Sequence, residues 1–126
     1  MYRLYRAADF CYVGSLHDGM NLVAKEFVSA RSDERGVLVL SEFAGAAQQL
    51  RAAVLVNPRR VEQSAAAIAA ALGMPAVEQT KRMRILRENV TSFDAAWWAR
   101  QLVDDATHHS AAAGQRQRSE LWSSVA

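Results

Sequence analysis

Three short apolar segments, separated by stretches with helical spacing, set the pattern of the chain. They lie at about 10–14, 37–41 and 53–57. Within the second and third segments, Val37–Leu40 and Ala53–Val56 are apolar at every position, which predicts strands that are covered on both faces. Strands of this kind are typical of parallel sheets, so we expect three parallel strands.

Helical patterns fill the segments between and after these strands. The expected helices are 2–8, 21–31, 43–50, 61–72, 77–89 and 91 to about 108. Gly73 and Pro75 end the fourth of them, and Thr91 or Ser92 can cap the last. Strands that alternate with helices through short links are typical of right-handed βαβ units. The chain is therefore predicted to be α/β, with a three-stranded parallel sheet flanked by helices.

Composition and charge narrow the class of protein. The chain has 126 residues, of which 51% are apolar and 22% charged, values typical of one folded domain. Its formal net charge of +2 gives no support for a nucleic-acid or membrane partner. Cys11 is the only cysteine, which excludes an intramolecular disulfide and a cysteine-rich zinc site. The longest apolar-rich stretch, 65–72, is too short to span a bilayer, and no signal-peptide pattern is visible, so we expect a cytoplasmic protein.

The loop 15–21 is the first candidate site, because it follows the first expected strand and leads directly into a helix. Ligands bind at the carboxyl ends of parallel strands, and the N–H groups that begin a helix suit a phosphate. Asp18 lies just before this helix and Glu26 about two turns after Asp18, and both carboxylates can accept hydrogen bonds from sugar hydroxyls. A phosphate site between two such carboxylates would fit a nucleotide-sugar. From the residues alone, an Asp-Gly before a helix is more often only a turn and a cap. Glu42 and Gly45 follow the second strand at the same edge and could touch the same ligand, but for both the start of a helix is the stronger interpretation.

The string 18–26, DGMNLVAKE, resembles the donor-binding segment of the trehalose-6-phosphate synthase family. Members of this family are retaining glycosyltransferases of the GT-B type, with two Rossmann-like domains, and they use UDP-glucose. The resemblance continues through 36–47, 55–58 and 98–100 and covers roughly residues 1–105. His17 differs from the Arg or Val that often precedes the Asp, and it also fits the related glucosylglycerol-phosphate synthases.

The resemblance implies a role for each residue of the string. It implies that Asp18 binds glucose hydroxyls, that Glu26 binds the uridine ribose, and that Leu22 and Val23 offer backbone N–H groups to the diphosphate. The implied donor-binding set is Asp18, Gly19, Met20, Asn21, Leu22, Val23, Ala24, Lys25 and Glu26. The family uses no metal or other cofactor and no protein nucleophile, so no catalytic residue is assigned here.

The resemblance covers only the C-terminal part of a family member. The acceptor domain and the first half of the donor domain, which carries the basic residues on the donor phosphates, have no counterpart here. We therefore expect 1–110 to be a partial donor-binding domain, followed by a disordered or frayed tail, 111–126, and the chain alone to be inactive. A sugar phosphate acceptor would bind only with the missing domain.

The alternative is a truncated, non-catalytic protein that binds a nucleotide-sugar or associates with a homologue. The strand 10–14 would expose one edge and could join two copies of the chain.

Overall fold

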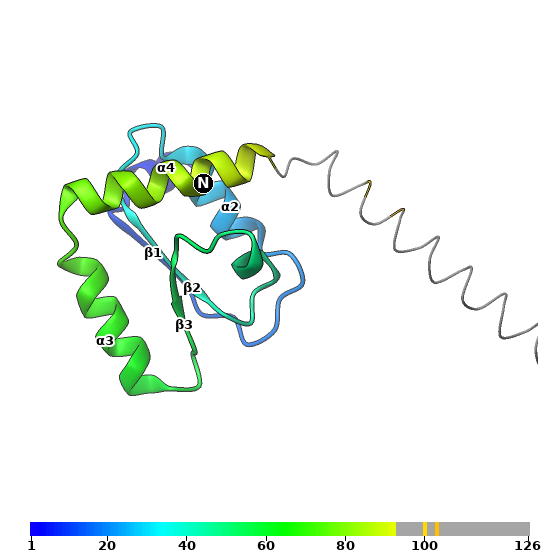
Figure 1. Ribbon diagram of the computed structural model, residues 1–126, viewed down its shortest axis with the longest axis vertical. Helices are drawn as coiled ribbons and strands as arrows, with labels where there is room; N and C mark the ends of the chain where they lie inside the picture. The colour runs from blue at the N-terminus through cyan, green and yellow to red at the C-terminus, as the bar shows by residue number, and fades with distance from the viewer. Residues whose placement is uncertain (93–99, 101–102, 104–126) are drawn as a thin grey trace, which may run out of the picture. The chain divides into compact units, whose positions relative to one another are not determined.

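The computed structural model describes residues 1–92 together with Arg100 and Val103 (Figure 1). The chain divides into two compact units, 1–92 and 93–126, and the first contains every element named below. Most of the expected last helix and the whole expected tail, 111–126, lie outside the described residues, so the domain boundary at 110 stays a prediction. In the described part, no helix is both long and apolar enough to cross a bilayer.

The first unit is an α/β structure built on one parallel sheet. Its elements are α1 Tyr2–Ala7, β1 Phe10–Val13, α2 Leu22–Ala30, β2 Val37–Ser41, the 3₁₀ helix η1 Gly45–Gln48, β3 Val54–Val56, α3 Val61–Leu72 and α4 Ala76–Ser92. The strand order is β1-β2-β3, with Phe10 opposite Val37 and Val39 opposite Val54. The prediction of three parallel strands flanked by helices is confirmed.

The core lies on both faces of β2, every residue of which is buried. Alternate residues of a strand point to opposite faces, so β2 contributes to two clusters. One cluster joins β1 and β2 to α2 and α4 through Val13, Leu38, Leu40, Ala24, Phe27, Val28, Met83 and Leu86. The other joins β2 and β3 to α3 through Val37, Val39, Val56 and Ala71. Helices therefore cover both faces of the central strand, as its uniformly apolar sequence predicts (Figure 1).

The prediction that β3 is covered on both faces is wrong. Leu55, in the middle of the strand, is 44% exposed, whereas Val56 is buried. Leu55 faces a groove that it shares with Glu42 and Arg51, beside η1. The four residues of η1 are too few to cover this groove, so an apolar strand residue lies open to solvent.

Two expected helices have different bounds in the structure. The segment 43–50 forms only the 3₁₀ turn η1, in which hydrogen bonds join residues three apart, such as Ala47 N–H to the Ala44 carbonyl. The expected break between 89 and 91 is absent, because α4 continues to Ser92. The hydroxyls of Thr91 and Ser92 donate to carbonyls one turn back rather than capping a new helix.

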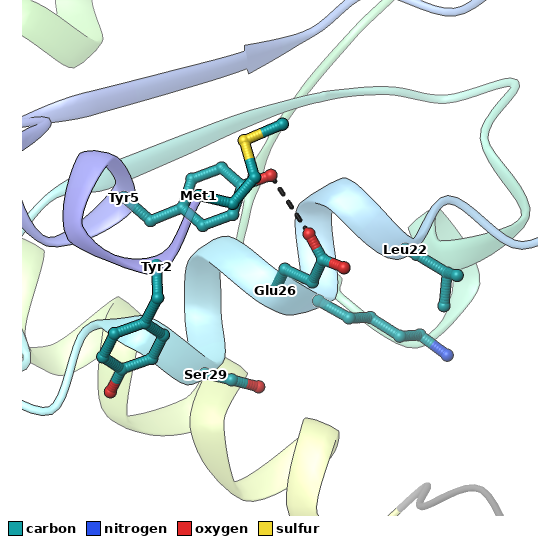
Figure 2. Close-up of a pocket in the computed structure, with 7 residues that line it drawn as sticks. Met1, Tyr2, Tyr5, Leu22, Glu26 and Ser29 are labelled. Carbon is teal, nitrogen blue, oxygen red and sulfur yellow. Dashed lines mark hydrogen bonds between the residues drawn. The ribbon is translucent and has the colours of Figure 1, made fainter.

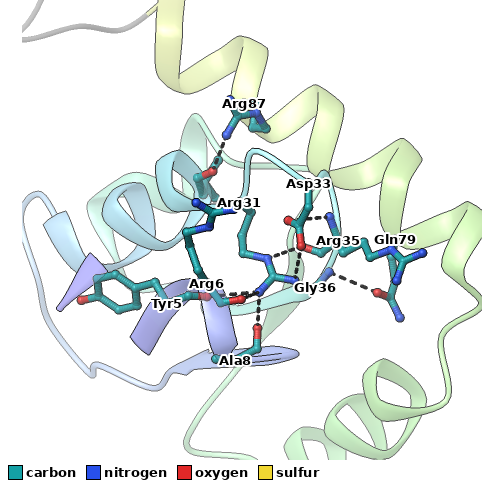
Figure 3. A network of polar contacts seen from close by, with 10 residues as sticks. Tyr5, Arg6, Ala8, Arg31, Asp33, Arg35, Gly36, Gln79 and Arg87 are labelled. Carbon is teal, nitrogen blue, oxygen red and sulfur yellow. Dashed lines mark hydrogen bonds and ion pairs between the residues drawn. The ribbon is translucent and has the colours of Figure 1, made fainter. Parts of the chain in front are cut away.

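The end of α2 is organised around a buried arginine, Arg31, which is 3% exposed (Figure 3). Its guanidinium donates to the carbonyl oxygens of Tyr5 (3.2 Å), Arg6 (2.7 Å), Ala8 (2.8 Å) and Arg35 (2.8 Å). It also forms an ion pair with Asp33 at 3.1 Å and lies 6.0 Å from the centroid of the Phe27 ring. Because the last carbonyls of a helix have no partner inside it, Arg31 completes the end of α1 and fixes α1 against α2.

The loop that connects β1 to α2 is held on the start of η1. The Gly45 N–H donates to the Asp18 carbonyl at 2.7 Å, and Asp18 forms a parallel bridge with Ala44. A Cβ atom at Gly45 would collide with the carbonyl oxygen of Gly19, whereas a Cβ atom at Gly19 would meet nothing within 4 Å. Close backbone approach is therefore required at Gly45, and Gly19 leaves open space in front of the loop.

Replacing Arg31 with methionine should destabilise the chain by about 2–4 kcal/mol, because four partly buried carbonyls lose a charged donor at once. The matched control is Arg35→Met, since the Arg35 side chain is exposed and only its backbone carbonyl contacts Arg31. Urea unfolding followed by circular dichroism measures both variants. Equal stabilities for Arg31→Met and Arg35→Met would contradict the assignment.

Replacing Gly45 with alanine should lower the free energy of unfolding by about 1–3 kcal/mol, because the loop at Gly19 must move to admit the methyl group. The same change at Gly19 should alter stability by no more than about 0.5 kcal/mol. Thermal unfolding of the two variants makes the comparison. A Gly19→Ala variant as unstable as Gly45→Ala would show that the loop does not rest on η1 in this way.

Candidate functional site

The carboxylate of Asp18 organises the loop at the carboxyl end of β1. One oxygen, Oδ1, accepts the N–H groups of Met20 (3.2 Å) and Asn21 (3.0 Å), and Oδ2 accepts the Asn21 side-chain amide at 2.8 Å. These bonds, led by the Asn21 N–H, hold the pKa of Asp18 below its usual range. Asp18 is therefore ionised at neutral pH and is first of all a partner of its own loop.

Asn21 turns the chain from this loop into α2. It has a left-handed backbone, with φ of 50°, and is buried, and its side-chain oxygen accepts the Ala24 N–H at 2.9 Å. Asn tolerates this conformation better than most residues because its short polar side chain bonds locally. The remaining N–H groups of the first turn belong to Leu22 and Val23, whose side chains are 58% and 45% exposed. The start of α2 thus presents two backbone donors and the positive end of the helix dipole at the surface.

Glu26 lies one turn further along α2, at the wall of a pocket of about 440 Å³ (Figure 2). The pocket is lined by Met1, Tyr2, Tyr5, Leu22, Lys25, Glu26 and Ser29, so it lies between α1 and α2. The Tyr5 hydroxyl donates to Glu26 Oε2 at 3.1 Å. Burial lowers the pKa of Lys25 from its usual value.

The structure brings the nine predicted donor-binding residues together as one loop and the first half of α2. Their side chains are not equally available, however. Ala24 is fully buried in the core, and its N–H is taken by Asn21, so it has no atom to offer a ligand. Asp18 and Asn21 spend most of their hydrogen-bonding capacity on each other. Ala24 therefore packs α2 against the sheet, and its assignment to the donor-binding set stays a prediction.

Sequence reasoning missed Tyr5 as part of this site, and it named Gly45 without predicting its contact with the loop. Tyr5 contacts Glu26 from α1, and Gly45 supports the loop from η1. Gly45 is also the first residue of η1, in line with its interpretation as the start of a helix. Among the described residues, no group of three or more His, Cys, Asp or Glu side chains is arranged to hold a metal ion.

Comparison with known proteins identifies the family. The model of glycosyltransferase family 20 matches residues 1–108. The trehalose-6-phosphate synthase of Mycobacterium sp. (strain JLS) is 53% identical over 98 residues, which are 78% of this chain and 20% of that protein. The trehalose-6-phosphate synthase of Mycobacterium leprae (strain TN) is 52% identical over 100 residues, 79% of this chain and 20% of that protein. The chain thus spans about a fifth of the length of these relatives.

Solved structures agree with this result. An α,α-trehalose-phosphate synthase (UDP-forming) from Burkholderia xenovorans, in complex with glucose-6-phosphate, has a TM-score of 0.77 at 46% identity and covers 82% of this chain and 23% of its own. An E. coli structure bound with UDP-2-fluoro glucose has a TM-score of 0.77 at 40% identity, with the same coverage of 82% and 23%. The resemblance to trehalose-6-phosphate synthases and the partial Rossmann-like GT-B fold are confirmed. The chain belongs to glycosyltransferase family 20.

Proposed function

We propose that this chain forms the glucose and ribose side of the UDP-glucose site in a cytoplasmic trehalose-6-phosphate synthase. The enzyme would transfer glucose from UDP-glucose to glucose 6-phosphate and release UDP. The observation that carries the proposal is the ordered segment 18–26. It joins the Asp18 carboxylate, held by N–H groups of its own loop, to the start of α2 and to Glu26 in the first half of that helix. Relatives that cover most of the chain are trehalose-6-phosphate synthases, which supports the same assignment.

Each part of the segment has a role in this proposal. The N–H groups of Leu22 and Val23 bind the diphosphate, whose negative charge grows as UDP leaves, and the dipole of α2 stabilises that charge. An ionised carboxylate has about four acceptor positions, of which Asp18 uses three within its loop, so one is available for a glucose hydroxyl. Glu26 accepts the hydroxyls of the ribose. No described residue of the segment is assigned as a nucleophile.

A chimeric enzyme tests the proposal. The chain's 98 matched residues replace the corresponding segment of the Mycobacterium sp. (strain JLS) synthase, to which they are 53% identical. We expect this chimera to release UDP from UDP-glucose in the presence of glucose 6-phosphate. Asp18→Ala or Glu26→Ala in the chimera should lower kcat/KM for UDP-glucose about 10- to 150-fold, the effect of losing a charged hydrogen-bond partner.

Two controls accompany the chimera. Glu62→Ala removes an exposed carboxylate from α3, away from the loop, and should leave the kinetics unchanged. The 126-residue chain assayed alone should give no turnover, because the proposal assigns the acceptor and the remaining phosphate contacts to residues outside it. An active chimera with unchanged constants in both the Asp18 and Glu26 variants would refute the donor assignment. Turnover by the purified chain alone would refute the assignment of the acceptor and the remaining phosphate contacts to residues outside it.

We also infer that two copies of the chain pair through the outer edge of β1. Among the described residues β1 pairs only with β2, and Tyr12 on this strand is 43% exposed. An open strand edge is a template for a further strand, and a second copy supplies an identical one.

Tyr12→Lys should weaken this association, because a lysine on an edge strand opposes pairing. Leu55→Lys, the same change of charge on β3 at the opposite edge, is the matched control and should leave the dimer intact. Size-exclusion chromatography with light scattering measures the mass of each species. A wild-type monomer with slow amide exchange at Tyr12 and Val13 would overturn the inference.

A further inference from the structure

The Tyr5 hydroxyl and the Glu26 carboxylate form a hydrogen bond that links two separate helices. The donor lies on α1 and the acceptor on α2, 21 residues apart in sequence and 3.1 Å apart in space (Figure 2). The bond engages Oε2 of the carboxylate, and Oε1 is the second acceptor oxygen of Glu26.

Tyr5 is itself held in place from two sides. Arg31 donates to its backbone carbonyl at 3.2 Å. Its ring meets the buried Phe27 ring edge-on, at a centroid distance of 6.4 Å and an angle of 81°. With both the backbone and the ring fixed, the hydroxyl has a defined position, which is unusual for a group that reaches a surface pocket. A tyrosine held in this way can orient a carboxylate.

We propose that Tyr5 is a positioning residue for Glu26, and that its hydroxyl turns the carboxylate so that Oε1 accepts a ribose hydroxyl of the nucleotide-sugar. The inference rests on the proposed function, which places the ribose at Glu26. Tyr5 does not contact the donor itself. It reduces the rotamer freedom that Glu26 would otherwise lose when the ligand binds.

The chemistry of the pair suits this role. Burial, and then the hydrogen bond and negative charge of Glu26, raise the pKa of Tyr5 above its usual 10.0. The phenol therefore keeps its proton throughout the physiological range and always acts as a donor. The carboxylate accepts, so the direction of the 3.1 Å bond from Tyr5 to Glu26 is fixed.

The first test uses the 126-residue chain and needs no enzymatic activity. Tyrosine ring carbons are labelled, and the pKa of Tyr5 is measured by NMR in the wild type and in Glu26→Gln. We expect the pKa of Tyr5 to fall part of the way toward 10.0 in the variant, because burial remains but the negative charge of Glu26 is removed. An unchanged pKa would show that the two groups do not interact, and would overturn the inference.

The second test uses the chimera described above and compares Tyr5→Phe with Tyr12→Phe. Both changes remove one phenol oxygen and keep the ring, and Tyr12 lies on β1 outside the pocket. Tyr5→Phe should raise KM for UDP-glucose about 3- to 10-fold, leave kcat within about twofold, and not change KM for glucose 6-phosphate. Tyr12→Phe should change none of these constants.

Two competitive inhibitors separate a ribose contact from general damage. UDP carries the ribose and inorganic pyrophosphate does not, so Tyr5→Phe should weaken inhibition by UDP and leave inhibition by pyrophosphate unchanged. If Tyr5→Phe weakened inhibition by both compounds equally, or had the same kinetics as Tyr12→Phe, the role of Tyr5 would be overturned. The proposed function would still stand if Glu26→Ala lowered kcat/KM for UDP-glucose. Unchanged kinetics in Glu26→Ala would overturn this inference, and unchanged kinetics in Asp18→Ala as well would overturn the proposed function.

Discussion

The buried guanidinium of Arg31 is the interaction on which the arrangement of α1, α2 and the following loop depends. It satisfies carbonyls at the end of α1 and in the loop after α2, and it pairs with Asp33 (Figure 3). A planar group with five N–H donors can serve several acceptors at once, which a lysine cannot do. Removing such a group leaves several partly buried carbonyls without their donor at once, so its effect is larger than that of one hydrogen bond.

The same network connects stability to the candidate site. No residue of α1 is fully buried, and the helix is held by polar contacts and by Tyr5, which packs against the core and the Phe27 ring. Through α1, Arg31 fixes the backbone of Tyr5, and Tyr5 in turn contacts Glu26. A further arginine, Arg87 of α4, donates to the carbonyls of Val28 and Ser29 and completes the end of α2. The helix that carries the site, α2, is thus fixed at its C-terminal end, while its N-terminal end presents the backbone N–H groups of Leu22 and Val23.

The loop before α2 shows how a binding surface is built from groups that bond to each other. Asn21 holds the loop by donating two hydrogen bonds to the Asp18 carboxylate. Gly45, at the start of η1, allows the backbone of η1 to lie directly against the loop. The resulting surface has a defined backbone and little side-chain bulk at Gly19. Preorganisation of this kind lowers the entropy that a ligand must lose on binding.

The sequence by itself determined the features that depend on local pattern. Uniformly apolar segments predicted the three parallel strands, Gly73 and Pro75 predicted the end of α3, and the string 18–26 identified the family. Only the tertiary structure decided the features that depend on distant pairs. Arg31 looks like an ordinary charged end of a helix until its partners, 23 to 26 residues earlier, are in place. The requirement for glycine at 45 arises from the approach of Gly19, and the contact of Tyr5 with Glu26 joins separate helices. Periodicity reports which side of an element is buried, but which polar groups meet depends on how the elements pack together.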